Sequence, residues 1–327
     1  MKSNPLLGLA LILPLLFSAG TQAEPLAASK RPALMSDKAG RSLLIDLAYA
    51  GKRLVAVGER GHILFSDNDG KTWSQAKVPV SLMLTAVVFA NAQEGWAVGH
   101  DGVILYSSDA GASWRVQRAS NGHDDERAGS PLLDVWFADN QTGYAVGAYG
   151  YFLVTRDGGV TWEDAAGSLN NPDGLHLNAI AGSRENGAVY IAGERGLLFR
   201  SLDKGSNWSA LASPFDGSFF GISPLRDDLL LTYGLQGRLY RSADKGGSWQ
   251  LVPTGITSGL NDAIMLDNGQ VLVFGNAGVI LNARDSGLNF IPETRDDRQS
   301  IMAALPLPDA AVVTVGEGGI KMLPVSK

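Results

Sequence analysis

A short phrase, in which an apolar run leads into two glycines separated by two variable residues, occurs seven times along this chain. The first glycines of the copies are Gly58, Gly99, Gly147, Gly193, Gly234, Gly275 and Gly316. Successive copies are 41, 48, 46, 41, 41 and 41 residues apart. A repeat of this length and number indicates equivalent supersecondary units that bury their apolar faces against one another.

Each copy predicts two β-strands joined by a tight turn. Apolar and β-branched residues precede the first glycine, as in Val55-Ala-Val57, and a second alternating run follows the second glycine, as in Ile63-Leu-Phe65. Glycine supplies the positive φ that such turns often require. Another apolar segment lies upstream of each copy, for example residues 84–90. Its near-continuous apolar character predicts a strand that is buried on both faces.

An octet of the form S/T-x-D-x-G-x-T/S-W follows the paired strands in six of the units. Its third position is occupied by Asn68, Asp109, Asp157, Asp203, Asp244 and Asp285. We expect this side chain to accept hydrogen bonds from backbone amides two residues on, and the aromatic residue to start the next strand and pack back across the hairpin. Six equivalent side chains around a ring cannot converge on one substrate. We therefore assign them a structural role and name no catalytic residue.

Four strands in each unit, with short connections, predict an all-β fold, a seven-bladed β-propeller over residues 43–327. The seventh unit contains three predicted strands, the last near residues 320–323, and no fourth follows before Lys327. We expect the segment 24–42, with a strand near Pro32–Ser36, to supply the fourth strand and to close the ring.

The first 23 residues resemble a secretory signal peptide: Lys2 precedes an apolar run from Leu6 to Phe17, and Thr21-Gln22-Ala23 ends the segment. We therefore expect a periplasmic or otherwise extracytoplasmic protein. The absence of cysteine excludes disulfides, thiol catalysis and thiolate metal sites. The net charge of -6 does not favour a nucleic-acid partner. No phosphate loop, zinc-binding helix or dinucleotide fingerprint is present, so we expect no cofactor and no metal.

The paired G-x-x-G and S-x-D-x-G-x-x-W phrases resemble those of the Asp-box (BNR) propellers. Within that group the chain is similar to the photosystem II stability and assembly factor family and its bacterial relatives of unassigned role. The resemblance extends over residues 43–322. It implies a propeller with Asp-box (BNR) repeats that binds a membrane-protein client through an arginine-rich surface. Because the same phrases occur in sialidases and in receptors, they specify the architecture more sharply than the function.

If the upstream strand of each unit is innermost, the G-x-x-G turns and the links between blades share one face of the ring, and the Asp boxes lie on the other. The candidates for partner binding in these turns are Arg60, His100, Asp101, Tyr149 and Arg195. The two long intervals place insertions at residues 115–130 and 163–175 on the same face. The first insertion contains two further candidates, His123 and Arg127. Residues 123–126 allow a metal-site interpretation, but without a second histidine at ligand spacing a solvated acidic loop is favoured.

Four arginines recur beside the Asp boxes, at or next to the same position in their units: Arg156, Arg200, Arg241 and Arg284. They are candidates for a basic, partner-binding side of the ring, similar in kind to the surface that the family resemblance implies. The alternative is that they cover strand edges and pair with neighbouring acids. For each residue in the G-x-x-G turns, the alternative is a solvated tip without a partner.

The sequence thus predicts a monomeric, non-enzymatic assembly or stability factor for a membrane-associated protein complex. The client would be a photosystem II reaction-centre subunit in a photosynthetic host, and another envelope complex or transporter otherwise. The alternative is a secreted, sialidase-like glycoside hydrolase or a glycan-binding propeller. The F-R-I-P phrase of sialidases is absent, and the nearest string, Lys30-Arg31-Pro32, lacks its apolar residues. A central funnel holding two carboxylates at glycosidase separation would favour this alternative.

Overall fold

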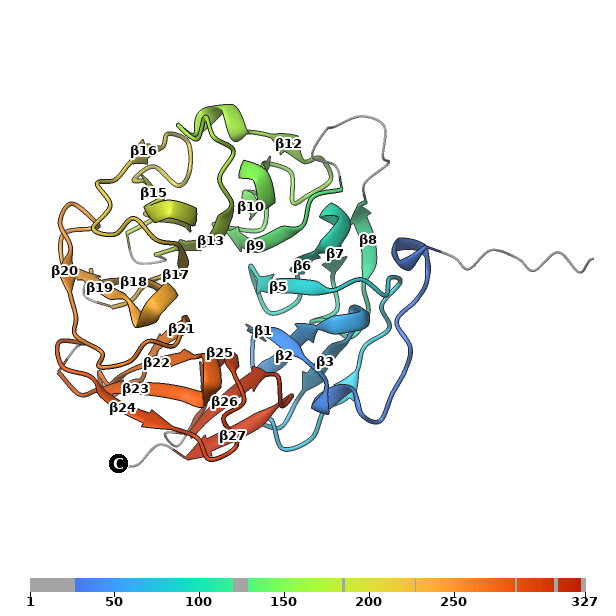
Figure 1. Cartoon of the computed structure of the whole chain (residues 1–327). Helices are drawn as coiled ribbons and strands as arrows, with labels where there is room; N and C mark the ends of the chain where they lie inside the picture. Colours follow the sequence, from blue (N-terminus) through green and yellow to red (C-terminus); the bar gives the residue numbers. More distant parts are fainter. Residues whose placement is uncertain are drawn as a thin grey trace, which may run out of the picture.

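In the computed structural model of this chain, the described residues form twenty-seven strands in seven antiparallel sheets around one axis (Figure 1). The structure describes residues 27–119, 129–183, 186–226, 228–285, 287–308 and 311–324. Within these residues, six sheets have four strands and one has three. The predicted all-β, seven-bladed β-propeller is confirmed.

The strands of each blade run outward from the axis in sequence order. Blades one and two contain β1 (Leu44–Ala50), β2 (Arg53–Gly58), β3 (Ile63–Ser66), β4 (Ser74–Gln75), β5 (Leu84–Phe89), β6 (Gly95–Gly99), β7 (Ile104–Ser107) and β8 (Arg115–Arg118). Blades three and four contain β9 (Leu132–Phe137), β10 (Gly143–Gly147), β11 (Phe152–Thr155), β12 (Glu163–Asp164), β13 (Leu177–Gly182), β14 (Val189–Gly193), β15 (Leu198–Ser201) and β16 (Ser209–Ala210).

The remaining blades follow the same order, except that blade seven has three strands. Blades five to seven contain β17 (Phe219–Pro224), β18 (Leu230–Gly234), β19 (Leu239–Ser242), β20 (Gln250–Leu251), β21 (Leu260–Met265), β22 (Val271–Gly275), β23 (Val279–Ala283), β24 (Ile291–Thr294), β25 (Ile301–Pro306), β26 (Ala311–Gly316) and β27 (Lys321–Pro324). Short 3-10 turns are η1 (Ala28–Lys30), η2 (Ala39–Arg41), η3 (Glu59–Gly61), η4 (His100–Gly102), η5 (Ala148–Gly150), η6 (Ala166–Ser168), η7 (Glu194–Gly196), η8 (Leu235–Gly237) and η9 (Asn276–Gly278). No described helix is long and apolar enough to cross a membrane.

Every innermost strand carries a bulge near its start. In blade one, Leu44 pairs with Gly58 and Asp46 pairs with Val57, which leaves Ile45 without a partner on β2. A bulge bends its strand and redirects the side chains beside it. The seven bulge residues all line a cavity on the ring axis: Ile45, Thr85, Leu133, Asn178, Phe220, Asn261 and Met302.

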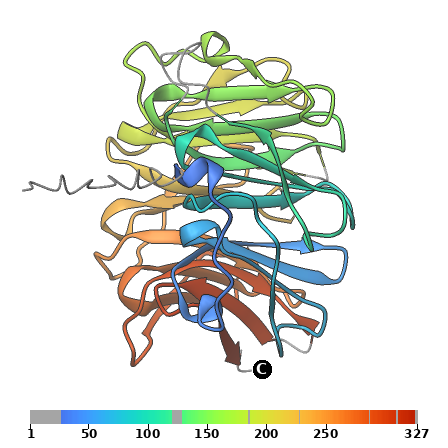
Figure 2. The same cartoon turned by 90° about the vertical axis from the view of Figure 1, so that its right-hand side faces the viewer.

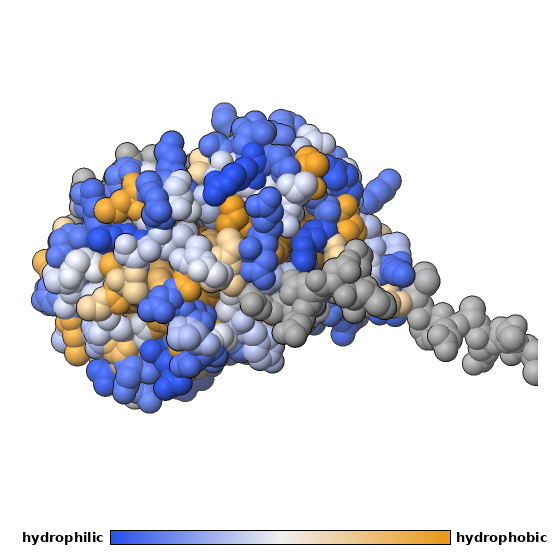
Figure 3. Space-filling view, turned by 90° about the horizontal axis from the view of Figure 1, so that it is seen from above, coloured by the Kyte–Doolittle hydropathy of each residue, from blue (hydrophilic) through white to orange (hydrophobic). Residues whose placement is uncertain are grey.

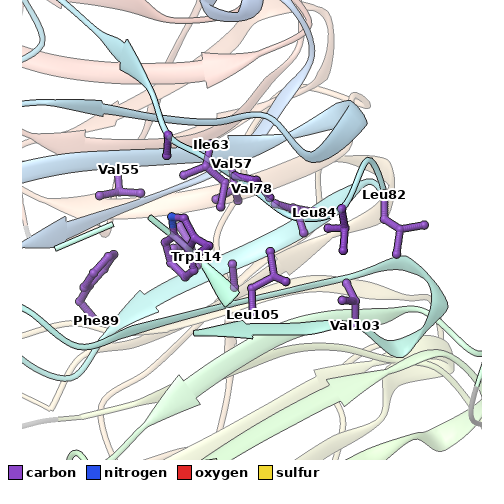
Figure 4. Packing of buried hydrophobic residues seen from close by; sticks show 14 of the residues in the cluster. Val55, Val57, Ile63, Val78, Leu82, Leu84, Phe89, Val103, Leu105 and Trp114 are labelled. Atoms are coloured by element: carbon purple, nitrogen blue, oxygen red, sulfur yellow. The ribbon is translucent and has the colours of Figure 1, made fainter. Parts of the chain in front are cut away.

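The hydrophobic core lies between the blades. Between blades one and two, Val57 and Ile63 pack with Leu105 and Trp114 (Figure 4). Burying a side chain of this size stabilises the fold by roughly 1.5–3 kcal/mol. Because each of the seven hydrophobic clusters joins two consecutive blades, an isolated blade would leave much of this surface exposed.

Ring closure differs from the prediction. Residues 27–42 contain two 3-10 turns and no strand. They run along blade one and meet blade seven only near Gly40, and they do not complete its sheet (Figure 2). The amide of Ala33 donates to the carbonyl of Val78 at 3.0 Å, and the Ser36 amide donates to Gln75 Oε1 at 2.8 Å. The predicted closing strand near Pro32–Ser36 is therefore wrong. Pro32 lacks the N–H that a paired strand would use, and Ala33 and Ser36 bond to residues of blade one and its link instead.

Side-chain packing closes the ring between blades seven and one, together with a main-chain hydrogen bond from the Ile320 amide to the Gly40 carbonyl at 3.0 Å. Leu44 and Leu54 of blade one share a buried cluster with Val315 of blade seven. The hydroxyl of Tyr49 donates to the carbonyl of Pro306 at 2.6 Å across the same junction. Within the described residues, no strand pairs across this junction.

Candidate functional site

The two faces of the ring carry different turns, as the sequence predicted. On one face, each G-x-x-G turn approaches a link between blades: a Cβ added to Gly61 would lie 2.1 Å from the carbonyl oxygen of Val80. On the other face, the Asp boxes approach the loops between the first two strands of a blade, where the Ala110 amide donates to the carbonyl of Gln93 at 3.0 Å. We call these the G-x-x-G face and the Asp-box face.

The tips of six G-x-x-G turns share one backbone conformation. The residue before the second glycine is not glycine, yet it adopts a left-handed φ in each turn. These residues are Arg60 (57°), Asp101 (56°), Tyr149 (57°), Arg195 (50°), Gln236 (58°) and Ala277 (57°). A left-handed conformation costs a non-glycine residue roughly 1–2 kcal/mol. All six side chains are exposed, so packing does not explain why these turns lack glycine at the tip.

Four of the predicted partner-binding residues, Arg60, Asp101, Tyr149 and Arg195, therefore occupy equivalent tips, and His100 lies beside Asp101. Tyr149 has 62% of its surface exposed, which is unusual for an aromatic side chain in a strained turn. Its ring meets His176 edge to face, with 5.0 Å between the ring centroids. His176 in turn donates its amide to Glu194 Oε2 at 2.8 Å, next to Arg195. This cluster brings aromatic and charged groups of blades three and four together.

The insertion at residues 163–175 lies on the G-x-x-G face, as predicted. A Cβ added to Gly150 would lie 2.9 Å from Nδ2 of Asn171, beside the Tyr149 tip. Asn171 also holds the link in shape, because its Oδ1 accepts the amide of Leu175 at 3.0 Å. The other two candidates, His123 and Arg127, lie outside the described residues.

The Asp boxes are turns held by side-chain hydrogen bonds. In blade two, Asp109 Oδ1 accepts the amide of Ser113 at 2.9 Å, and the Ser107 hydroxyl accepts the amide of Gly111 at 2.9 Å. The carboxylate thus clamps an amide four residues on, and not two as predicted. The indole of Trp114 donates to the Gly111 carbonyl at 3.0 Å while its ring fills the junction between blades one and two.

The same clamp recurs at Asn68, Asp157, Asp203, Asp244 and Asp285. Hydrogen bonds from Asn207 and Ser201 lower the pKa of Asp203 to about 2. Bonds from Ser242 and Ser248 lower the pKa of Asp244 to about 2. An acid that stays ionised and fully hydrogen-bonded suits a structural clamp and not proton transfer.

The four arginines beside the Asp boxes do not occupy a single position. Arg200 and Arg241 immediately precede the box serine, whereas Arg156 and Arg284 immediately follow the first box residue. Arg200 donates from Nη1 to the carbonyl of Lys245 in the next blade at 2.8 Å. Arg156 is exposed beside Tyr144 and hydrogen-bonds its hydroxyl, and Arg284 is also exposed. Arg200 thus joins two blades, while Arg156 and Arg284 present their side chains to solvent on the Asp-box face.

Sequence reasoning missed a cavity of about 590 Å³ on the ring axis. Asn276 of η9 lines it, so it reaches the G-x-x-G face. Three carboxylates, from Asp46, Asp134 and Asp262, face this cavity. Each stands directly after the bulge of its innermost strand.

Each of these carboxylates joins two blades. Asp46 accepts the amide of Leu47 at 2.8 Å through Oδ1 and the amide of Val87, in blade two, at 2.7 Å through Oδ2. Asp134 reaches Ile180 of blade four, and Asp262 reaches Ala304 of blade seven, in the same way. The three residues are therefore inter-blade connectors as well as walls of the cavity.

Burial raises the pKa of all three carboxyl groups. It raises the pKa of Asp46 to about 8, and the negative charges of Asp134 and Asp262 add to this shift. Burial likewise raises the pKa of Asp134 to about 7 and that of Asp262 to about 6. The sequence does contain a signal for this site: the repeated start Leu-x-Asp puts an ionisable residue in a strand that is otherwise apolar.

The family assignment follows from a comparison of the sequence with protein-family models. A model described as photosynthesis system II assembly factor YCF48 matches residues 32–127 and 125–252. The chain belongs to this family. Two solved structures of YCF48 proteins resemble this chain over most of its length. One is "YCF48 bound to D1 peptide", with a TM-score of 0.71, 16% identity, and coverage of 91% of this chain and 100% of that chain.

The second structure is YCF48 from Cyanidioschyzon merolae, with a TM-score of 0.69, 17% identity, and coverage of 86% of this chain and 95% of that chain. At these identities the likeness supports the fold alone. Among curated proteins, the uncharacterised protein YkuO of Bacillus subtilis (strain 168) is 34% identical over 79 residues. That match spans 24% of this chain and 26% of YkuO, about a quarter of each.

Proposed function

We propose that this YCF48-family chain is a non-enzymatic assembly or stability factor that holds a membrane-associated protein on its G-x-x-G face. The observation that carries the proposal is the set of exposed, left-handed turn tips, of which Arg60, Asp101, Tyr149 and Arg195 present charged or aromatic side chains. Strained, exposed residues on a rigid scaffold are typical of binding surfaces. Tyrosine and arginine are also the side chains most enriched among residues that dominate binding energy.

The character of the surface suits recognition of a mixed polar and apolar segment. On the outer side of the ring, which Figure 3 presents edge-on, apolar residues are interspersed among polar ones. The Tyr149–His176 pair supplies an aromatic contact, and Glu194 and Arg195 supply charges of both signs beside it. An uncharged lipid surface would not use such a pattern, whereas a folded or extended polypeptide would.

The family and the sequence support a proposal for the client. The solved structure of a YCF48 with a D1 peptide supports a polypeptide segment of a membrane protein as the partner. We propose that the client is a photosystem II reaction-centre subunit in a photosynthetic host and another envelope complex or transporter otherwise. We also propose that the chain is exported by residues 1–23 and acts as a monomer in the periplasm or another extracytoplasmic space.

Affinity capture from detergent-solubilised envelope tests this proposal. Wild type is compared with Tyr149→Ala/Arg195→Glu on the G-x-x-G face and with a matched pair on the other face, Arg156→Glu/Arg284→Glu. We expect one membrane protein to co-purify with wild type and to be lost with the first pair only. Loss with the second pair alone would place the client on the Asp-box face. If no membrane protein co-purifies, the assembly-factor proposal fails.

A glycan-processing propeller is the second candidate, and the axial cavity favours it. Three carboxylates with separated pKa values face one cavity, and aromatic residues Phe220 and Tyr233 line it with them. Glycosidases use a pair of carboxyl groups whose environments set different pKa values. Turnover of fluorogenic sialosides or glucosides by wild type, abolished in Asp134→Asn, would establish an enzyme. We expect no turnover, because all three carboxylates already accept two backbone amides each.

A further inference from the structure

Six of the seven junctions between blades contain an aromatic side chain from an Asp box. An aromatic residue that ends an Asp box packs into the hydrophobic cluster at the junction with the preceding blade. These residues are Trp73, Trp114, Trp162, Trp208, Trp249 and Phe290. In the described part of the chain, the cluster between blades six and seven has no such aromatic residue.

A groove of about 510 Å³ lies at this seventh junction. Its apolar wall combines Leu272, Phe274 and Ile280 of blade six with Val312 and Leu323 of blade seven. Its volume lies within the range of pockets that bury drug-sized or peptide side-chain ligands. The groove therefore has the place and the apolar lining that the other six junctions use for an aromatic ring.

The sheet beside the groove ends on an open edge. Strand β27 is the outermost strand of blade seven, whereas β4, β8, β12, β16, β20 and β24 occupy the corresponding outer position in the other blades. Among the described residues, nothing pairs with the outer side of β27. Unpaired N–H and C=O groups of an edge strand are a template for another extended segment.

The rim of the groove is acidic. Glu293, Asp296 and Asp297 line it together with a single cation, Arg295. Asp297 Oδ2 accepts from Arg295 Nη2 at 2.7 Å and also from the ammonium of Lys321, so it holds both nearby cations. The remaining carboxylates give the rim an excess of negative charge, which favours a basic ligand.

We propose that this groove and the edge of β27 bind an extended segment of the client, which adds a fourth strand to blade seven. The segment carries an aromatic residue that enters the groove and a basic residue that meets its acidic rim. The proposal rests on the proposed function, since the client supplies the segment. It adds a contact on the outer side of the ring to the contacts on the G-x-x-G face.

The chain itself provides a probe for this site. A peptide that copies residues 107–118 contains a complete Asp box, the aromatic residue Trp114, and Arg115 immediately after it. In blade two the same sequence fills the corresponding junction and pairs Arg115 with Tyr106 of the neighbouring strand. The labelled peptide is titrated into the full chain, and binding is followed by fluorescence anisotropy.

We expect saturable binding that weakens about tenfold or more when Trp114→Ala is made in the peptide. In the protein, Leu323→Asp should weaken binding to a similar extent. Met322→Asp is the matched control, because the neighbouring side chain points to blade one, where its sulfur would lie 3.3 Å from a Cβ at Gly70. Hydrogen exchange of the wild-type complex provides a readout without a variant: the β27 amides should gain protection.

Absence of binding, or binding that is indifferent to the tryptophan, would overturn the proposal. Protection at another blade would do the same. If the β27 amides are already protected in the free protein and the peptide does not bind, a segment of this chain or a second copy fills the groove, and the assignment to the client is wrong. The assay contains no client, so its failure leaves the capture experiment on the G-x-x-G face as an independent test.

Discussion

At the scale of single residues, six of the G-x-x-G turns contain two adjacent residues that share a left-handed φ but lie in different surroundings. Their second glycine has a φ between 62° and 77°. In turns such as those of Gly61, Gly196 and Gly237 it contacts a neighbouring link so closely that a side chain there would collide. The residue before it has the same left-handed φ but points into solvent. Glycine would relieve the strain at this tip. Tyr149 and Arg195 stand there instead, and under the proposed function their side chains contact the client.

Tyr149→Gly should leave the free energy of unfolding within about 1 kcal/mol of wild type, because relief of the left-handed strain offsets the entropy that glycine adds to the unfolded chain. Client capture should fall. Gly111→Ala is the contrasting variant: its φ is 82°, and a Cβ there would lie 3.1 Å from Val55 Cγ2. It should lower stability by about 1–2 kcal/mol. Urea denaturation measures both variants, and a large loss for Tyr149→Gly would contradict this assignment.

At the scale of the structural element, the Asp box connects a turn to the next blade junction. The box acid fixes the turn, and the turn fixes the position at which the aromatic residue enters the core. Asp109 makes this link in blade two through Ser113, while Trp114 returns a hydrogen bond to Gly111.

Asp109→Ala should lower the free energy of unfolding by about 1–3 kcal/mol, since the amide of Ser113 and the hydroxyls of Ser113 and Ser107 lose their acceptor. Client capture per folded molecule should stay unchanged. Asp109→Asn, which retains one acceptor oxygen as Asn68 does in blade one, should recover part of the loss. An unchanged stability of Asp109→Ala, followed by chemical denaturation, would show that the turn holds without its clamp.

The elements that repeat were predictable, and the exceptions were not. The regularly spaced glycines and Asp-box tryptophans predict the strands, the turns and the number of blades, because each copy must form the same turns and the same packing contact. The connector role of Asp46 was not predictable, because it depends on a bulge that turns the side chain toward the axis and on an amide 41 residues away. The failed closing strand has a similar origin, since only the folded ring shows that Ala33 finds a partner at Val78 in blade one.

At the scale of the whole molecule, two populations of aspartate act on stability in opposite directions. The box residues Asp203 and Asp244 have a lowered pKa, so the stability they add is present above the ordinary pKa of 3.8 and is lost as the pH falls toward about 2. The axial carboxylates have a raised pKa. The folded state therefore holds their protons more tightly than the unfolded state, and ionising them lowers stability as the pH rises from 3.8 toward about 8.

The melting temperature should therefore be highest on the acidic side of neutrality and should decline between about pH 5 and pH 8. Asp46→Asn should flatten this decline, because an amide does not ionise, at the cost of one inter-blade acceptor. Asp203→Asn should lower the melting temperature by a similar amount at every pH in this range, because the ionised carboxylate adds its stability throughout it, and should leave the decline itself unchanged. Differential scanning calorimetry across this range checks all three profiles. A wild-type melting temperature that climbs steadily to pH 8 would show that the axial carboxylates ionise freely.

Six junctions of the ring are crossed by the main chain. The seventh, between blades seven and one, is held by packed side chains such as Leu44 and Val315 and by hydrogen bonds such as that from the Ile320 amide to the Gly40 carbonyl. The ring is thus continuous in the main chain except between blades seven and one. Spreading it at that gap would break apolar contacts and a few hydrogen bonds, yet every sheet ladder would stay intact. Tension applied between the first and last strands should separate blades seven and one before any sheet loses a strand.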